Sequence, residues 1–213
     1  MKTLLYKELR LTAHPTSVVF AFLGCLVLVP AYPYSVIFLF GCLAPYITLV
    51  NARETNDLWY TATLPMTKRE SVLSKCLLTA TFQLFQLAFS VPFACLRAVL
   101  AVPNNPVGLD ATAAWYGFGL MLYAVFDLVF LSSYFKSGYR VGRAFLLASV
   151  PMALGMAAVE TAGHLPALAW LDSVRPADLG RQVPILLAGL FLYAALLALT
   201  YRICARRYET VDL

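Results

Sequence analysis

Six apolar runs, each about as long as a membrane is thick, dominate this sequence. They cover residues 16–31, 34–50, 77–100, 112–135, 144–162 and 183–203. A helix needs about 20 predominantly apolar residues to cross the hydrocarbon core, where no water is available to hydrogen-bond an unpaired backbone. The pattern therefore predicts an all-α integral membrane protein with six transmembrane helices, forming a single domain over residues 1–213.

Composition and charge point the same way. Hydrophobic residues make up 61% of the chain and charged residues 13%, whereas soluble domains carry about 25% charged residues. The net charge of +5 comes from basic residues at the flanks of the apolar runs, which favours membrane lipid over nucleic acid as the contact. The five cysteines and two histidines show no ligand spacing, so we expect no metal site.

The basic residues also predict the orientation. With six spans both termini lie on one side, and 13 of the 16 Lys and Arg residues fall there. The other side carries Arg97, Arg175 and Arg181. Because Lys and Arg accumulate on the cytoplasmic side, we expect a multi-pass protein of a bacterial inner membrane with both termini in the cytoplasm.

The first two runs are short and are joined by a turn between Pro30 and Pro33. A re-entrant hairpin would give the same charge distribution as two complete spans. We favour two spans, because tilted neighbours and local thinning of the bilayer accommodate short helices.

Two features are predicted on the outer side. Asp110 precedes the fourth run and is placed to cap its helix, since aspartate accepts hydrogen bonds from free backbone N–H groups. The segment 166–181 mixes apolar and charged residues, which is typical of a short helix lying at the membrane surface.

The longest inner connection, residues 51–75, predicts structure of its own. Leu58 and Ala62 lie one helical turn apart beside Trp59, and Pro65 ends this short amphipathic helix. Thr67 and Glu70 then match a capping box that starts the third long helix before the membrane. On physical grounds the short helix either anchors the neighbouring spans or docks a partner.

A family resemblance favours docking. Glu54 after the second span, the short helix, the sequence Leu-Pro-Met-Thr-Lys-Arg at 64–69 and Lys75 at the mouth of the third span resemble the membrane subunits of type-2 ATP-binding-cassette exporters. The sequence Lys-Glu-Leu-Arg at 7–10 resembles the amphipathic elbow helix of that family, here residues 1–14. The six-span layout extends the resemblance over essentially the whole chain.

The resemblance implies a coupling helix that seats in a separate ATPase subunit. The residues implied in docking are Glu54, Asp57, Leu58, Trp59, Leu64, Pro65 and Lys68. The sequence lacks the phosphate-binding pattern Gly-x-x-x-x-Gly-Lys-Ser/Thr, so we expect no cofactor in this chain, no enzymatic activity of its own, and ATP with Mg²⁺ in the partner. The working unit would contain two membrane subunits, identical or different, and two ATPases.

The substrate is less defined by this resemblance. The chain is similar to the compact permeases of phenol-soluble modulin exporters, which implies an amphipathic or antimicrobial peptide. A drug or a lipid stays open.

Polar residues within the runs are candidate functional sites, because burying them in lipid is costly. Gln83 and Asp127 are expected at similar depth with Gln86 one turn away, so they form either a hydrogen-bonded clamp between helices or a substrate contact. Arg97 and Glu160 both approach the outer boundary and could pair there. We favour a structural or snorkelling role for both.

Ser149, Ala153 and Ala157 form a small-residue stripe on the fifth run. Such a stripe permits close helix approach, at a subunit interface or in internal packing. Two other functions stay open, an intramembrane enzyme and a stand-alone secondary transporter. The first would need converging catalytic groups and the second internal repeats, and neither pattern is evident.

Overall fold

The chain forms an elongated bundle of helices. The computed structural model describes residues 2–30, 32–100, 102–137 and 140–209, without the side chains of Lys2, Leu58, Ala62, Ala98 and Pro176. The long helices are α3 (Ser35–Glu54), α5 (Lys68–Val99), α6 (Ala113–Lys136), α7 (Val141–His164) and α8 (Pro176–Glu209). The short elements are α1 (Lys2–Lys7), the π-helical turn η1 (Glu8–Thr12), α2 (Pro15–Phe22), the 3-10 helices η2 (Leu23–Leu28) and η3 (Pro166–Leu171), and α4 (Asp57–Thr63).

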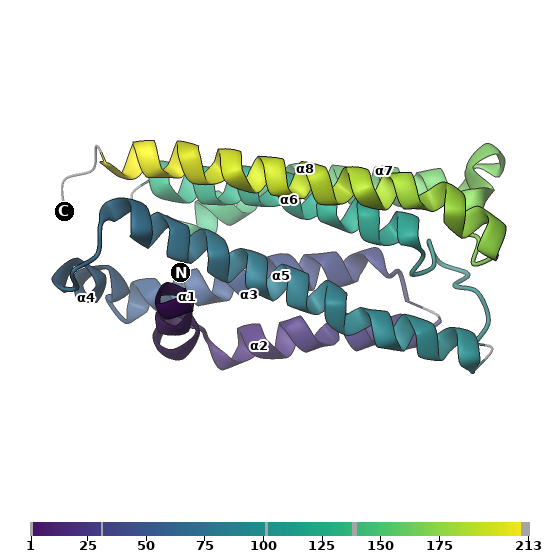
Figure 1. The fold of residues 1–213 in the computed structure, drawn as a ribbon, viewed down its shortest axis with the longest axis horizontal. Helices are drawn as coiled ribbons and strands as arrows, with labels where there is room; N and C mark the ends of the chain where they lie inside the picture. Colours follow the sequence, from purple (N-terminus) through teal and green to yellow (C-terminus); the bar gives the residue numbers. More distant parts are fainter. Residues whose placement is uncertain (1, 31, 101, 138–139, 210–213) are drawn as a thin grey trace.

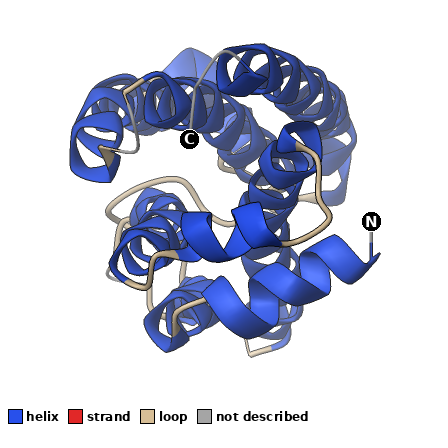
Figure 2. Cartoon of the chain, turned by 90° about the vertical axis from the view of Figure 1, so that its left-hand side faces the viewer, coloured by secondary structure: helices blue, strands red, loops and turns tan. Residues whose placement is uncertain are grey.

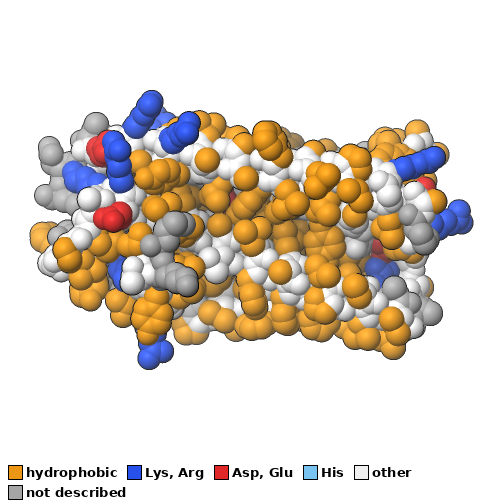
Figure 3. All heavy atoms as spheres, viewed as in Figure 1, with side chains coloured by type: hydrophobic (Ala, Val, Ile, Leu, Met, Phe, Trp, Pro, Cys, Tyr) orange, Lys and Arg blue, Asp and Glu red, His pale blue; other side chains and the backbone are white. Residues whose placement is uncertain are grey.

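The two ends of the bundle differ. Both chain termini and α4 lie at one end, called the proximal end, and the connections α2–α3, α5–α6 and α7–α8 lie at the other, called the distal end (Figure 1). Hydrophobic side chains cover the middle of the face seen in Figure 3, while Lys and Arg gather towards the two ends. A surface that is apolar along its length and charged at its ends matches a bilayer bounded by water.

Five helices are long and apolar enough to cross a membrane, namely α3, α5, α6, α7 and α8. They cover the five predicted runs from 34–50 onward to within one residue at each end, and α5 and α8 begin well before their runs with polar turns. The remaining run is less regular. α1 and η1 bend by 106° into α2 and η2, and the bent pair would make six spans if it counts as one.

The first run reaches the distal end as a helix. Eight residues of α2 and six of η2 extend roughly 24 Å, because a 3-10 helix rises about 2 Å per residue and an α-helix 1.5 Å. The Asn105 amide donates a 2.8 Å hydrogen bond to the carbonyl oxygen of Tyr32, so the turn after η2 contacts the α5–α6 connection. The predicted limits at residues 1 and 31 lie outside the described residues.

Helix α6 is the centre of the bundle. It packs most extensively on α8 and α7, and its Trp115, Tyr123 and Phe126 are fully buried. The α6–α8 contact depends on Gly117 and Gly189, since a Cβ added to either would collide with the backbone of the other helix. Close backbone approach through small residues is how helices associate where lipid removes the hydrophobic drive.

Two predictions for the distal side were wrong. Helix α6 starts at Ala113 with Thr112 as its N-cap, whose hydroxyl accepts a 3.3 Å hydrogen bond from the backbone N–H of Trp115. Asp110 instead pairs with Arg97. The segment 166–181 is not one surface helix, because the 3-10 turn η3 ends at Leu171 and α8 already begins at Pro176.

Candidate functional site

The connection between α3 and α5 turns sharply before and after α4. Asn56 has φ 54° and ψ 34°, a left-handed conformation that asparagine tolerates better than most residues. After α4, the backbone N–H of Thr67 donates to Glu70 Oε2 (2.8 Å) and the N–H of Glu70 donates to Thr67 Oγ1 (3.2 Å). This reciprocal pair confirms the predicted capping box and fixes the start of α5.

The outer surface of α4 carries exposed aromatic side chains. Trp59 is 78% exposed and Tyr60 51% exposed, and the flanking residues Glu54 and Pro65 are also exposed. Large aromatic rings are favoured anchors at protein interfaces because they bury much area with few rotatable bonds. Of the residues expected to dock an ATPase, Glu54, Trp59 and Pro65 have the exposure that a contact requires. Tyr60 was not among the expected residues.

The other expected docking residues are placed differently. Asp57 is 7% exposed and points into the protein, so its assignment as a direct partner contact is corrected to an internal one. Leu64 is half-buried. Lys68 is also half-buried, and its ammonium lies 5.9 Å from the centre of the Tyr208 ring. The side chain of Leu58 lies outside the described residues.

Asp57 belongs to a buried ion network that joins the four elements α1, η1, α4 and α5. It is here called the quartet: Lys7, Glu8, Asp57 and Lys75. Lys75 Nζ lies 2.8 Å from Glu8 Oε2 and 2.6 Å from Asp57 Oδ2. Lys7 Nζ lies 3.1 Å from Asp57 Oδ1 and 3.2 Å from Glu8 Oε1. Each carboxylate thus faces both ammonium groups, and the four formal charges sum to zero.

Hydroxyl groups complete the network. Ser74 Oγ donates to Glu8 Oε1 at 2.8 Å, Thr12 Oγ1 donates to Asp57 Oδ1 at 3.3 Å, and Lys7 Nζ donates to Thr61 Oγ1 at 2.6 Å. Burial by itself would raise the pKa of Asp57, but the ammonium groups of Lys75 and Lys7 outweigh it and lower this pKa. Asp57 is therefore ionised throughout the physiological range, as its position requires.

The elbow formed by α1 and η1 lies across the proximal end beside α4 (Figure 2). Lys7, Glu8 and Thr12 of the elbow reach α4 and α5 through the quartet and its hydroxyl partners. Within the elbow, Glu8 is fully buried, while Tyr6 and Leu11 are exposed. The acidic side chain of the elbow therefore faces the protein, and its apolar side chains Tyr6 and Leu11 face outward.

The intramembrane polar residues form two hydrogen-bonded groups. Gln83 Nε2 donates to Asp127 Oδ1 at 2.7 Å, and the Tyr193 hydroxyl donates to Gln83 Oε1 at 2.9 Å. Gln86 accepts from the Tyr123 hydroxyl and donates to the carbonyl oxygen of Phe20. The first group ties α5 to α6 and α8, and the second ties α5 to α6 and α2. The side chains of Gln83, Gln86, Asp127 and Tyr123 are fully buried.

Arg97 and Glu160 at the distal end do not pair with each other. Arg97 Nη1 contacts Asp110 Oδ1, and Arg97 also donates to the carbonyl oxygen of Pro103. Glu160 instead accepts a hydrogen bond from the Ser35 hydroxyl and one of 3.1 Å from the backbone N–H of Leu109. The possible Arg97–Glu160 pair is thus replaced by separate contacts that join each residue to the α5–α6 connection.

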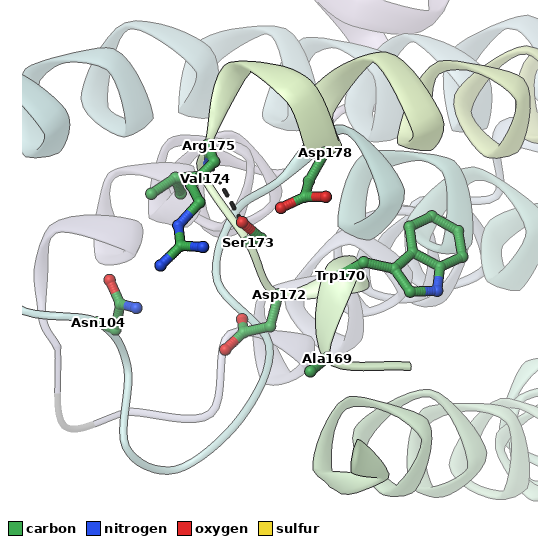
Figure 4. A pocket seen from close by; sticks show the side chains of 8 residues that line it. All are labelled: Asn104, Ala169, Trp170, Asp172, Ser173, Val174, Arg175 and Asp178. Atoms are coloured by element: carbon green, nitrogen blue, oxygen red, sulfur yellow. Dashed lines mark hydrogen bonds between the residues drawn. The ribbon is translucent and has the colours of Figure 1, made fainter. Parts of the chain in front are cut away.

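The distal end also carries an open pocket of about 410 Å³. Figure 4 shows its lining side chains, which are Asn104, Ala169, Trp170, Asp172, Ser173, Val174, Arg175 and Asp178. Asp172 accepts a 2.6 Å hydrogen bond from the backbone N–H of Asp110. Burial raises the pKa of Asp172, although the N–H of Asp110 lowers it in part.

The small-residue stripe of α7 faces outward. Ala153 and Ala157 are exposed, as are Leu146, Val150 and Leu154 on the same helix, while the Ser149 hydroxyl bonds to its own helix at the carbonyl oxygen of Phe145. Internal packing is therefore the wrong interpretation for the two alanines. Close packing inside the chain instead uses Gly117 and Gly189, which the predicted stripe did not include.

Within the described ranges, no group of three or more His, Cys, Asp or Glu residues is placed to hold a metal ion. The buried acidic residues Glu8, Asp57, Asp110 and Asp127 are instead engaged with ammonium, guanidinium or amide donors.

Comparison with family models identifies the family of this chain. Residues 3–209 match the model of an ABC-2 family transporter protein, so the chain belongs to the ABC-2 transporter family. No curated protein and no solved structure matches the chain significantly.

Membership in this family supports a multi-pass membrane permease that normally works with a separate ATP-binding subunit. It favours the transporter over the intramembrane enzyme and the stand-alone secondary transporter. Together with the long apolar helices, it supports the class that the resemblance indicated.

Sequence reasoning missed the role of Lys7 and Glu8, which were assigned only to the elbow. A signal was present, because Asp57 and Lys75 flank a predicted membrane surface and carry opposite charges. A charge at such a position requires a partner. The sequence does not show that both partners come from a segment about 50 residues earlier in the chain.

Proposed function

We propose that this chain is the permease subunit of an ATP-driven exporter, with six spans, both termini in the cytoplasm and α4 as the helix that docks a separate ATPase. The partner would bind ATP and Mg²⁺, and two permease subunits would enclose the substrate path. Trp59 and Tyr60 carry this proposal, because they are exposed on α4 at the proximal end of the bundle (Figure 1). The chain also belongs to a transporter family.

The placement of charge supports the orientation. Basic residues lie at the proximal end in the first turn of α5, such as Arg69, and in the last turn of α8, where Arg206 and Arg207 lie. Positive residues of membrane proteins accumulate in the cytoplasm. The contact between Asn105 and Tyr32 supports a first span that crosses completely, because it puts the α2–α3 turn among the distal connections.

The outward face of α7 supports a second membrane subunit. Ala153 and Ala157 lie on it beside large apolar side chains, and small residues in that position permit close approach of another helix. The second subunit would be a copy of this chain or a related one.

For the substrate we propose an amphipathic peptide. Phe22 of α2 and Phe85 of α5 pack edge to face at 5.2 Å between ring centroids and are both partly exposed at the surface of the bundle. These rings would offer a hydrophobic surface to the apolar side of such a peptide. Stimulation of the ATPase by an amphipathic helical peptide, but not by its scrambled sequence, would test this part.

The docking proposal is tested by the variant Trp59→Glu. We expect the tagged wild-type chain to co-purify with a Walker-type ATPase and the variant to lose most of it, since a charge would replace the central aromatic anchor. Trp59→Phe should retain the partner. Arg140→Glu, which changes an exposed residue of another connection at the same end, is the matched control. Equal recovery of the ATPase with Trp59→Glu and wild type would refute the docking assignment.

Orientation needs a separate experiment. Single cysteines replacing Asn104 at the distal end and Arg140 at the proximal end, both exposed, would be introduced into a chain without its native cysteines. A membrane-impermeant maleimide added to intact cells should label the first and spare the second. The opposite pattern would invert the orientation.

A further inference from the structure

We infer that the elbow (α1 and η1), the helix α4 and the first turns of α5 move as one rigid body, and that the quartet holds this body together. Lys7, Glu8, Asp57 and Lys75 then act as positioning residues for α4. The inference rests on the proposed function in one respect only, which is that α4 receives its movement from an ATPase.

The connectivity of the quartet carries the inference. Lys75 of α5 contacts Glu8 of η1 and Asp57 of α4 through one ammonium group, at 2.8 and 2.6 Å. Lys7 contacts the same two carboxylates from the other side. Each element is thus joined to the others by at least one charge-assisted contact, and moving any element alone separates a cation from an anion.

Burial makes that separation costly. Glu8 is fully buried, and Lys75 and Asp57 are 3% and 7% exposed, so water cannot readily replace a lost partner. In a low-dielectric environment an unpaired charge is far less favourable than a paired one. The elements therefore keep their mutual positions unless the whole quartet opens.

The chain bends next to this body. Ala13 and His14 have extended backbones, with ψ of 124° and 141°, between η1 and α2, and the 106° bend lies there. Helix α2 is capped independently of the elbow, because His14 Nδ1 accepts a hydrogen bond from the backbone N–H of Thr16. The elbow can therefore change its angle to α2 without breaking a helical hydrogen bond of either segment.

This arrangement extends the role of the elbow. A displacement of α4 would reach the first span through the elbow and the third span through Lys75 at the same time. Without the quartet, α4 would lose its ionic contacts with the elbow and with α5.

Hydrogen exchange of the purified full-length chain in lipid nanodiscs tests the rigid body without any ATPase. In Lys75→Gln we expect amides of residues 8–12 and 57–63 to exchange about tenfold faster or more, and to do so together, because local opening follows the loss of buried contacts. Arg69→Gln is the control, since Arg69 lies near Lys75 on α5 but forms an exposed bridge to Glu209. It should leave both segments unchanged.

A second variant guards against simple misfolding. Glu8→Gln combined with Lys75→Gln removes one anion and one cation and leaves Lys7 and Asp57 as a balanced pair. Its exchange should lie closer to wild type than that of Lys75→Gln, as expected for coupled charges. Faster exchange in only one of the two segments, or a double variant as perturbed as the single one, would overturn the inference.

The complex with the ATPase gives the functional readout. Lys75→Gln should keep the ATPase bound and hydrolysing but lower substrate export per ATP severalfold, whereas Arg69→Gln should leave this ratio unchanged. If the wild-type chain binds no ATPase, the proposed function fails while the exchange result still decides the rigid body. If the exchange result holds and export per ATP is unaffected, the quartet is structural and its positioning role is refuted.

Discussion

The two ends of the bundle handle buried charge in different ways. At the proximal end, two carboxylates and two ammonium groups form the closed quartet, with each acid between two bases. At the distal end, Arg97 pairs with Asp110, while Glu160 and Asp172 are held by hydroxyl and backbone N–H donors. At the proximal end both acids of the quartet are balanced by ammonium groups, whereas the distal end combines one ion pair with two acids held by uncharged hydrogen-bond donors.

The difference shows in the two aspartates whose pKa values shift in opposite directions. The pKa of Asp57 is lowered, because its ammonium partners outweigh burial, and the pKa of Asp172 is raised, because burial outweighs its partners. Ion pairs therefore stabilise the ionised form of Asp57 at the proximal end, whereas burial disfavours the ionised form of Asp172 at the distal end. The same change, aspartate to asparagine, should then have opposite consequences at the two ends.

The largest effect is expected for Asp57→Asn. The change leaves Lys7 and Lys75 with one carboxylate between them, and an uncompensated buried charge costs about 3 to 5 kcal/mol. The free energy of unfolding, measured by reversible denaturant titration in mixed micelles, should fall by that amount. A loss below about 1 kcal/mol, the range of surface pairs, would show that the quartet is hydrated.

Arg97→Gln should have an intermediate effect. It leaves Asp110 without its guanidinium, but the backbone N–H of Asn105 still donates to that carboxylate at 3.2 Å. We expect a loss of about 2 kcal/mol in the same titration, as for removing one partner of a charged hydrogen bond. A loss equal to that of Asp57→Asn would contradict the contrast between the ends.

The pH dependence of stability separates the two aspartates. Asp57 contributes stability that is present above the ordinary aspartate pKa of about 3.9 and is lost as the pH falls through its lowered value in the folded protein. Asp172 acts in the opposite direction, because its raised pKa means that stability declines as the pH rises from about 3.9 through that value. The difference between wild type and Asp172→Asn, followed from neutral to mildly acidic pH, should shrink or reverse in favour of the wild type.

The smallest effect is expected for Asp172→Asn itself at neutral pH. Asparagine keeps an oxygen that accepts from the N–H of Asp110 and removes a charge that burial disfavours. The unfolding free energy should change by less than about 0.5 kcal/mol or rise slightly. A marked loss would show that Asp172 has an ionic partner and would place the distal end in the same class as the proximal one.

Much of the fold follows from local sequence. The run 112–135 forms α6 almost residue for residue. Lipid offers no hydrogen-bond partners, and an α-helix pairs its backbone N–H and C=O groups within a single segment. Thr67 and Glu70 fixed the start of α5, since a capping box acts over three residues. The equal depth of Gln83 and Asp127 was also readable, because depth depends only on distance from the charged flanks.

The partners of the individual charged residues could not be predicted from the sequence. Arg97, Asp110 and Glu160 lie at similar depth, but the rotation of α5 and α7 brings Arg97 to Asp110 and Glu160 to Ser35. Asp57 looked like an outward residue of an amphipathic helix, yet the elbow lies against that side of α4.

The sequence by itself determined that this chain is a helical membrane protein with its basic residues mostly at one end. Those properties depend on each segment's own transfer from water to lipid, and neighbouring segments barely alter them. The tertiary structure alone decided that Lys7, Glu8, Asp57 and Lys75 meet, and that Gly117 meets Gly189. Such contacts depend on how the helices rotate and cross, which is set by the packing of all of them together.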